Sequence, residues 1–348
     1  MLLSIMKAVL SLDWLQLHVD CSLCSFDPAY SWKLEPYQTK QFRKIYKLMW
    51  QGEELGTAVC DPTSVIIHQS CMIVKFANRQ LYSPYLHNII AAFLSHNNLL
   101  FKGVTRCDLA FDFNRFNRGL EPENFIWRFI NGQIWKVGRG KFSVTGEQKR
   151  GNKFRYLRFG SKTSEINTYL YNKSVELTQV QDKPYIREKW LNAGLSKKQD
   201  VWRLEISIKG TGTRYVDFET GDLTRISWED LANPDRLKQI FEAYISVHFK
   251  FVINDGQRNK SRMAVVDLID FGDIVLKPCY LPTSTGSNRS DKVFLKKLHL
   301  LDQELRGLSE FGAENQKDLL IDFLYATDMF DYYEKNKDFW HVDTKRPY

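Results

Sequence analysis

The stretch TRCDLAFDF, residues 105–113, decides the fold that we expect for this chain. It alternates as a β-strand does, in which successive side chains point to opposite faces. One face is apolar and consists of Cys107, Leu109, Phe111 and Phe113. The other face consists of Arg106, Asp108, Ala110 and Asp112. Two carboxylates and a cation on one strand face, with a small alanine between the acids, indicate a site for a metal ion or a phosphate-bearing substrate.

A second strand, VWRLEISI at residues 201–208, repeats this design, because Arg203 and Glu205 share one face and apolar residues share the other. If the two strands lie in one sheet with their apolar faces on the same side, Asp108, Asp112 and Glu205 converge. Three oxygen ligands of this kind suit Mg²⁺ or Mn²⁺. The alternative is a pair of half-buried strands whose acids and arginines form cross-strand ion pairs.

Residues 154–173 predict a strand, a turn at Gly160-Ser161 and a second strand over 167–173. Tyr169, Tyr171 and Lys173 share one face of that second strand. A free tyrosine has a pKa of about 10 and attacks poorly at neutral pH, but a metal ion and a neighbouring ammonium can activate it. A tyrosine beside a lysine is therefore a candidate nucleophile; the alternative for any one of the 16 tyrosines is simple packing.

With these motifs in this order, the chain resembles the replication initiation factor family of rolling-circle plasmids, the staphylococcal-type initiators. Replication proteins of filamentous phages are more distant relatives of that family. The resemblance covers residues 8–255 and rests on five motifs. They are Asp13-Trp14-Leu15, Arg106 to Asp112, Phe159-Gly160-Ser161 with Ser164, Tyr171-Asn172-Lys173 with Glu176, and Arg203-Leu204-Glu205. Asn172 departs from the family pattern, in which many members carry an acid at that position.

The resemblance implies an enzyme that nicks and rejoins origin DNA. Tyr171 would attack the scissile phosphodiester, which leaves a 5′-phosphotyrosyl enzyme and a 3′-hydroxyl that primes synthesis. Lys173 and Arg203 complete the implied catalytic set, and Asp108, Asp112 and Glu205 would hold Mg²⁺ or Mn²⁺. Nickases of a neighbouring superfamily bind their metal with a His-hydrophobe-His pair. No two of the seven histidines here are separated by one residue, so the carboxylates remain the expected ligands.

Two functions from other classes compete with this interpretation. One is a metal-dependent endonuclease in which the three acids activate water without a covalent intermediate. The other is a DNA-binding replication protein without catalytic activity, which a lost tyrosine or lost acids would favour; this chain keeps all of them. The partners that we expect are origin DNA, single-stranded or as an extruded hairpin, the host replicative helicase and a second copy of the chain, with no membrane.

The composition agrees with a DNA-binding protein. The formal net charge is +8 and the pI is about 9.0, which suits a polyanionic partner. Six scattered cysteines include one C-x-x-C pair without a second pair for zinc, and neither a secretory signal nor a membrane-spanning segment is recognisable, so we expect a cytoplasmic protein. Residues 136–153 predict a mobile basic hairpin that follows a DNA backbone. Its cations are Lys136, Arg139, Lys141, Lys149, Arg150 and Lys153.

The pattern of strands and helices predicts an α+β fold, an antiparallel β-sheet with helices packed on one face. Strands are expected over 8–20, 40–50, 53–60 and 70–77, and helices over 84–97, 121–131, 184–194 and 234–248. We expect a catalytic domain over residues 1–255. Residues 256–348 are expected to form a linker and a small C-terminal helical region, with helices over 291–308 and 315–334, for origin or partner recognition.

Overall fold

The computed structural model describes residues 7–64, 67–138, 141–148, 152–161, 164–179, 182–196, 198–218 and 220–279. The linker and helices predicted beyond residue 280 lie outside these ranges. The described residues form two compact units. Unit 1 comprises residues 7–15, 78–88 and 106–279, and unit 2 comprises residues 16–77 and 89–105. No helix in the described part of the chain is long and apolar enough to cross a membrane.

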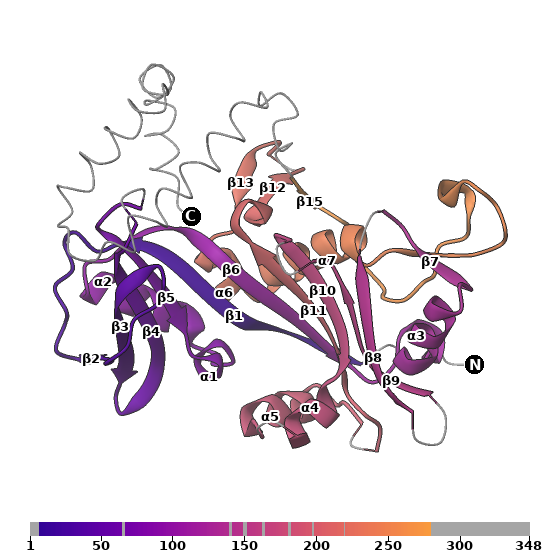
Figure 1. The fold of residues 1–348 in the computed structure, drawn as a ribbon, viewed down its shortest axis with the longest axis horizontal. Helices are drawn as coiled ribbons and strands as arrows, with labels where there is room; N and C mark the ends of the chain where they lie inside the picture. The colour runs from indigo at the N-terminus through magenta and orange to yellow at the C-terminus, as the bar shows by residue number, and fades with distance from the viewer. Residues whose placement is uncertain are drawn as a thin grey trace. The chain divides into compact units, whose positions relative to one another are not determined.

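Unit 1 is built on an antiparallel sheet, drawn in Figure 1, and the predicted α+β class is confirmed. Its central strand β11 (Trp202–Lys209) pairs with β6 (Leu100–Phe113) on one side and with β10 (Ile166–Asn172) on the other. Next to β10 follow β9 (Asn152–Phe159) and β8 (Phe142–Gln148), and next to β6 lies β1 (Ala8–Asp20). Residues 8–15 of β1 and 106–113 of β6 belong to this unit.

The register of β6 and β11 brings together the two strand faces that carry charged residues. Arg203 lies opposite Asp112, Glu205 opposite Ala110, and Ser207 opposite Asp108. The two alternating stretches therefore lie in one sheet, which is the condition under which their charged faces were expected to converge. Glu205 lies diagonally between the two aspartates, because residues two apart on a strand share a face.

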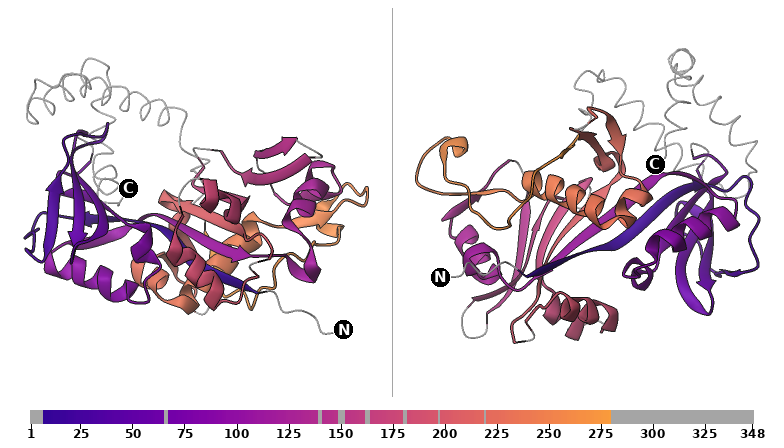
Figure 2. Two further views of the ribbon diagram at one scale, coloured as in Figure 1. Left: turned by 90° about the horizontal axis from the view of Figure 1, so that it is seen from below. Right: turned by 180° about the vertical axis from the view of Figure 1, so that it is seen from behind.

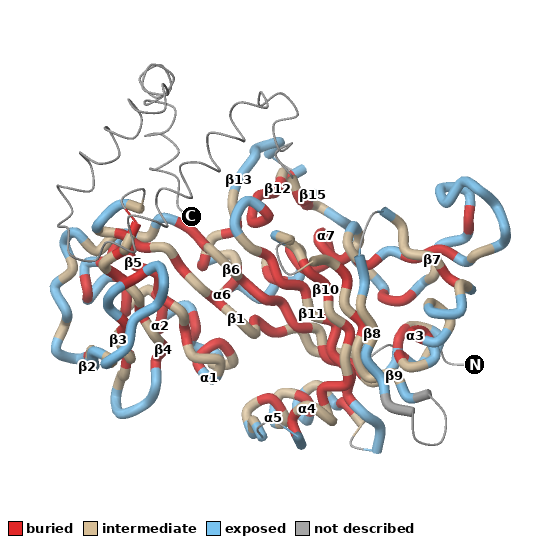
Figure 3. The backbone as a smooth tube through the Cα atoms, in the orientation of Figure 1, coloured by how far each residue is buried: buried red, intermediate tan, exposed pale blue. Residues whose placement is uncertain are grey.

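Helices cover the apolar face of this sheet. Helix α7 (Pro234–His248) lies across the strands in Figure 2, and Phe241 stacks on Phe111 of β6 with ring centroids 5.2 Å apart. Its predicted bounds are confirmed, since Asn233 caps the helix by accepting hydrogen bonds from the N–H groups of Asp235 and Arg236. Helix α6 (Trp228–Ala232) precedes it, and α3 (Pro122–Ile130) contacts β9. Buried residues follow β6, β10 and β11 in Figure 3.

Two helices follow β10 directly. Helix α4 (Lys173–Gln179) begins where the strand ends, and α5 (Pro184–Asn192) comes after it. Their apolar residues pack with the residue before β11, in a cluster of Leu177, Ile186, Trp190, Leu195 and Val201. The predicted second strand over 167–173 is therefore one residue too long, because Lys173 is already helical.

Short elements complete unit 1. Strand β12 (Arg214–Asp217) pairs with β13 (Leu223–Arg225) and with β15 (Leu276–Pro278), and β7 (Ile134–Lys136) pairs with β14 (Phe251–Ile253). Three-residue to four-residue 3₁₀ turns lie at Asn117–Gly119, Gly210–Thr213 and Lys260–Arg262. The described residues after 255 thus still belong to unit 1, and the C-terminal helical region stays a prediction.

Unit 2 contains the antiparallel strands β2 (Tyr30–Leu34), β3 (Phe42–Trp50), β4 (Glu53–Pro62) and β5 (Cys71–Phe76), with β5 paired to residues 16–20 of β1. Gln51 and Gly52 join β3 to β4 with φ of 51° and 79°, the left-handed turn that a tight hairpin needs, so the strands predicted over 40–50 and 53–60 form a hairpin. Helix α1 (Asn78–Leu81) follows β5 and lies in unit 1. The predicted helix at 84–97 is α2 (Leu86–His96), which begins two residues later than expected.

Candidate active site

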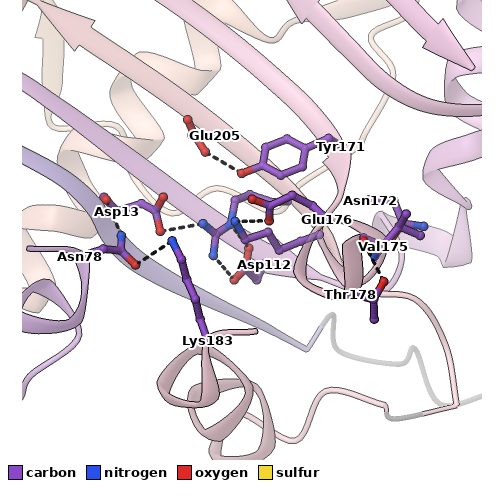
Figure 4. A network of polar contacts seen from close by, with 12 residues as sticks. Asp13, Asn78, Asp112, Tyr171, Asn172, Val175, Glu176, Thr178, Lys183 and Glu205 are labelled. Carbon is purple, nitrogen blue, oxygen red and sulfur yellow. Dashed lines mark hydrogen bonds and ion pairs between the residues drawn. The ribbon is translucent and has the colours of Figure 1, made fainter. Parts of the chain in front are cut away.

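Tyr171 and Glu205 form a hydrogen-bonded pair on the polar face of the unit 1 sheet. Across β10 and β11, Tyr169 lies opposite Glu205 and Tyr171 lies opposite Arg203. The Tyr171 side chain points diagonally to the neighbouring pair, and its hydroxyl donates to Oε2 of Glu205 at 2.8 Å (Figure 4). The predicted nucleophile therefore has a carboxylate within the distance that direct proton transfer requires.

The surroundings shift the pKa of both partners upward. Burial, followed by the charges of Asp13 and Asp108, raises the pKa of Glu205 to about 8. Burial, followed by the charge of Glu205, raises the pKa of Tyr171 well above its usual value. The phenol therefore keeps its proton at neutral pH, and the Glu205 carboxylate is a stronger base than a solvated one. The phenolic proton of Tyr171 can therefore pass directly to Glu205 when the phenolic oxygen attacks a phosphodiester.

Arg203 is the centre of a buried ionic network beside this pair. Its side chain has no exposed surface, and it makes four hydrogen bonds. Nε and Nη2 bind both oxygens of Asp112 at 2.6 and 2.8 Å, and Nη1 binds Oδ1 of Asp13 at 2.7 Å. The fourth bond goes to the Tyr82 hydroxyl at 3.0 Å. Four of its five N–H groups are thus engaged within the protein, so the guanidinium holds the acids around it in place.

The three predicted metal ligands do not fit a cation in this arrangement. Both oxygens of Asp112 accept from Arg203, and Oδ2 accepts a further bond from the Trp190 indole at 2.7 Å. Asp108 is bound by the Arg106 guanidinium at 3.0 and 2.5 Å. Within the described ranges, no group of three or more His, Cys, Asp or Glu side chains is arranged to hold a metal ion. The expectation of Mg²⁺ or Mn²⁺ stays a prediction.

Lys173 lies with its ammonium over the ring of Tyr171. Its ammonium pairs with Glu176 at 2.5 Å and lies 5.5 Å from the centroid of the Tyr171 ring, with 3% of the side chain exposed. Burial, followed by the charge of Arg203, lowers the pKa of Lys173. The lysine occupies the first position of α4 and not the strand face on which it was expected. Its contact with Tyr171 is a cation–π interaction.

Asp13 is the site residue that the candidate set left out, although its motif was recognised. Although burial opposes ionisation, the charges of Arg203 and then Lys173 hold the pKa of Asp13 well below its usual value. The Tyr82 hydroxyl donates to Oδ1 of Asp13 at 2.7 Å, and the Asn78 amide donates to its backbone oxygen at 2.6 Å. The strand pattern of residues 8–20 is the signal for Asp13. Asn78 begins the one-turn helix α1 and Tyr82 directly follows it, and a helix this short has no sequence periodicity by which it could be predicted.

Of the predicted DNA-binding cations, Lys136, Lys141 and Lys153 lie within the described residues. Lys136 is half-buried in β7, where it donates to the Val137 oxygen and lies 5.5 Å from the Phe159 ring centroid. Lys141 and Lys153 are exposed on or beside the β8–β9 hairpin. Arg139, Lys149 and Arg150 lie outside the described residues. Lys136 and Lys141 also line a cavity of about 640 Å³, with Thr168 on the face of β10 opposite Tyr171.

Similarity to known proteins was found at the level of structure. No protein-family model matches the chain, and no curated protein matches it. A solved structure that is similar is that of the rolling circle replication initiator protein from Geobacillus stearothermophilus. The match has a TM-score of 0.46 and 13% sequence identity, and it covers 74% of this chain and 92% of that chain.

Proposed function

We propose that this chain is a rolling-circle replication initiator that nicks and rejoins origin DNA through a covalent bond to Tyr171. The observation that supports it best is the 2.8 Å hydrogen bond from the Tyr171 hydroxyl to Glu205. A tyrosine needs a proton acceptor to attack a phosphodiester, and the raised pKa of Glu205 makes its carboxylate a stronger base than a solvated one. The order of motifs along the chain supports the same reaction.

In the proposed step, the Tyr171 oxygen attacks the scissile phosphorus while its proton passes to Oε2 of Glu205. The bond from phosphorus to the 3′-oxygen breaks, and that oxygen takes a proton from solvent. The products are a 5′-phosphotyrosyl chain and a free 3′-hydroxyl. Rejoining is the reverse, in which a 3′-hydroxyl attacks the phosphotyrosine and Glu205 returns a proton to the phenolic oxygen. The same two side chains therefore serve both directions of the reaction.

The buried network keeps this pair in place. Arg203 lies opposite Tyr171 on the next strand and ties β11 to β6 through Asp112 and to β1 through Asp13. Lys173 is held over the Tyr171 ring by Glu176. We assign both cations a positioning role, because both are buried and form ion pairs within the protein. Since the three acids do not fit a divalent cation together, the proposed step uses residues of the chain alone.

Origin DNA is the proposed substrate, as a single strand or an extruded hairpin, and the host helicase and a second copy of the chain are proposed partners. The decisive experiment incubates the full chain with single-stranded DNA spanning the origin of its own genetic element, with Mg²⁺ or Mn²⁺, and resolves the products on a denaturing gel. We expect a DNA-linked protein band that Tyr171→Phe abolishes. Cleavage without such a band would support a metal-dependent endonuclease, and binding without cleavage would support a non-catalytic protein.

A further inference from the structure

Two residues of β9 lie on the same sheet face as the nucleophile, and neither belongs to the motifs considered so far. Tyr156 lies opposite Tyr171, and Arg158 lies opposite Tyr169. Neighbouring strands are about 4.8 Å apart, so both side chains stand within one strand spacing of β10. The row continues across the sheet from Arg158 to Tyr169 and then to Glu205. Arg158 therefore belongs to a cross-strand row that leads through Tyr169 to the proposed proton acceptor.

Arg158 differs from Arg203, Lys173 and Arg106 in having no counter-ion among the described residues. Arg203 binds Asp112 and Asp13, Lys173 binds Glu176, and Arg106 binds Asp108. Arg158 is half-buried, and in the part of the chain that the structure describes it forms no ion pair. Its Nε is shielded from solvent and has no hydrogen-bond partner there. A buried N–H without an acceptor costs free energy, which an anionic ligand would recover.

Aromatic rings flank this cation. The rings of Tyr156 and Tyr169 have centroids 6.3 Å apart and are inclined by 47°, and Tyr156 and Tyr171 are 6.5 Å apart at 41°. Tyr156 and Tyr169 are half-buried, so part of each ring reaches the surface. Helix α7 packs on the other face of the sheet, where Phe111 meets Phe241. Aromatic rings beside an unpaired guanidinium on one sheet face are a combination with which proteins bind single-stranded nucleic acid.

We propose that Arg158, Tyr156 and Tyr169 form a nucleotide subsite that holds single-stranded DNA beside Tyr171. Arg158 binds a backbone phosphate with its unpaired N–H groups, and the two tyrosine rings stack on a base. This assignment rests on the proposed nicking function. It adds the path of the DNA strand, which crosses this sheet face, so that DNA binding does not depend on the basic hairpin alone. Base stacking tolerates any sequence, so the subsite holds the strand without selecting it.

The test measures binding of a fluorescein-labelled single-stranded oligonucleotide by anisotropy, in a Tyr171→Phe background that keeps the strand intact. Arg158→Ala should weaken binding about tenfold and lower the slope of log affinity against log salt by about 0.7, the value for one phosphate contact on a single strand. Arg155→Ala is the matched control, because it removes the same charge from the same strand on the alternate face. It should change neither affinity nor slope by a comparable amount.

The stacking role of Tyr156 and Tyr169 is tested with a separate set of variants. Tyr156→Leu and Tyr169→Leu should each weaken binding about fivefold or more, whereas the corresponding Phe variants keep the ring and should bind normally. If Arg158→Ala fails to fold, Arg158→Gln keeps hydrogen-bonding groups without the charge and should still lower the salt slope. Equal losses from Arg158 and Arg155 variants, or Leu variants that bind normally, would overturn the subsite. That outcome leaves the proposed function standing if the wild-type chain still forms its Tyr171 adduct, and absence of the adduct would instead overturn the function.

Discussion

The Tyr171 hydroxyl lies 2.8 Å from Oε2 of Glu205, although the two residues are 34 positions apart in the chain. The contact exists because β10 and β11 pair with Tyr169 opposite Glu205, which makes Tyr171 the diagonal neighbour of the acid. A one-residue shift in this register would move Glu205 to the apolar face. The strand pairing that builds the core of unit 1 therefore also sets the geometry of the proposed chemistry.

Tyr171→Phe should abolish the covalent protein–DNA adduct while leaving folding and DNA binding intact. The substitution removes only the attacking oxygen and keeps the ring that Lys173 contacts. Tyr169→Phe is the matched control, because Tyr169 lies on the same strand face directly opposite Glu205, whereas the hydrogen bond to Glu205 comes from Tyr171. The adduct is measured on a denaturing gel with labelled origin DNA. An adduct at normal yield in Tyr171→Phe would contradict the assignment of the nucleophile.

The rate of adduct formation should rise with pH and level off above about pH 8. Glu205 accepts the phenolic proton only as a carboxylate, and its pKa is raised to about 8 by burial and nearby acids. Below that pH the rate should fall about tenfold per unit, because only the ionised fraction reacts. Glu205→Gln should lower the rate by roughly 10²- to 10⁴-fold, as expected for loss of a general base. Single-turnover rates between pH 6 and 9.5 test this, and a flat wild-type profile would contradict it.

Glu205→Gln should also stabilise the fold, and more at high pH than at low pH. A carboxyl whose folded pKa is raised binds its proton more tightly in the folded state, so wild-type stability falls as pH rises from about 4.5 to 8. Glutamine cannot ionise and avoids that loss. The thermal midpoints of the two proteins should therefore nearly agree near pH 4.5 and differ most above pH 8. A difference that does not depend on pH would show that Glu205 ionises as freely in the folded protein as in the unfolded chain.

Replacing Lys149, Arg150 and Lys153 together with alanine should weaken DNA binding and flatten its salt dependence. Each lost phosphate contact lowers the slope of log affinity against log salt by about 0.7 to 0.9. Adduct formation at saturating DNA should remain, because none of these residues belongs to the Tyr171–Glu205 pair. Anisotropy titrations at several salt concentrations measure both quantities. Unchanged affinity and slope would remove these cations from the DNA interface.

The sequence predicted β6 and β11, which carry the acids and Arg203, because in both stretches an apolar face alternates with a face that bears charged residues. The same reasoning found α7, whose apolar stripe and Asn233-Pro234 start are local signals. What it could not find were the partners of each charge. Asp13 and Arg203 are 190 positions apart, and Trp190 binds Asp112 from a helix 78 positions away. Contacts of that separation depend on the tertiary fold, which no local period encodes.

This difference matters most for the interpretation of the acids. From the strand pattern alone, Asp108, Asp112 and Glu205 form a set of oxygen ligands and equally a set of ion-pair partners. The structure supplies the missing information, since it pairs Asp112 with Arg203 and Asp108 with Arg106. The strand pattern also misplaced Lys173, because β10 ends at Asn172 and Lys173 begins α4. Sequence periodicity placed the residues on one face without assigning their roles.

Asp112→Asn should destabilise the protein by about 3 kcal/mol, because it leaves the buried Arg203 charge without its bidentate partner. The loss should be the same in Mg²⁺, in Mn²⁺ and in EDTA, since Asp112 has no oxygen free for a cation. Arg203→Lys should cause a comparable loss, because an ammonium cannot reproduce the two parallel bonds to Asp112.

Asp61→Asn is the control, an aspartate whose ion pairs lie at the surface of unit 2, and it should cost well under 1 kcal/mol. Urea unfolding in each metal condition measures all three variants. If wild-type stability rises with Mg²⁺ or Mn²⁺ and Asp112→Asn abolishes that rise, Asp112 is a metal ligand and its role in the buried network is secondary.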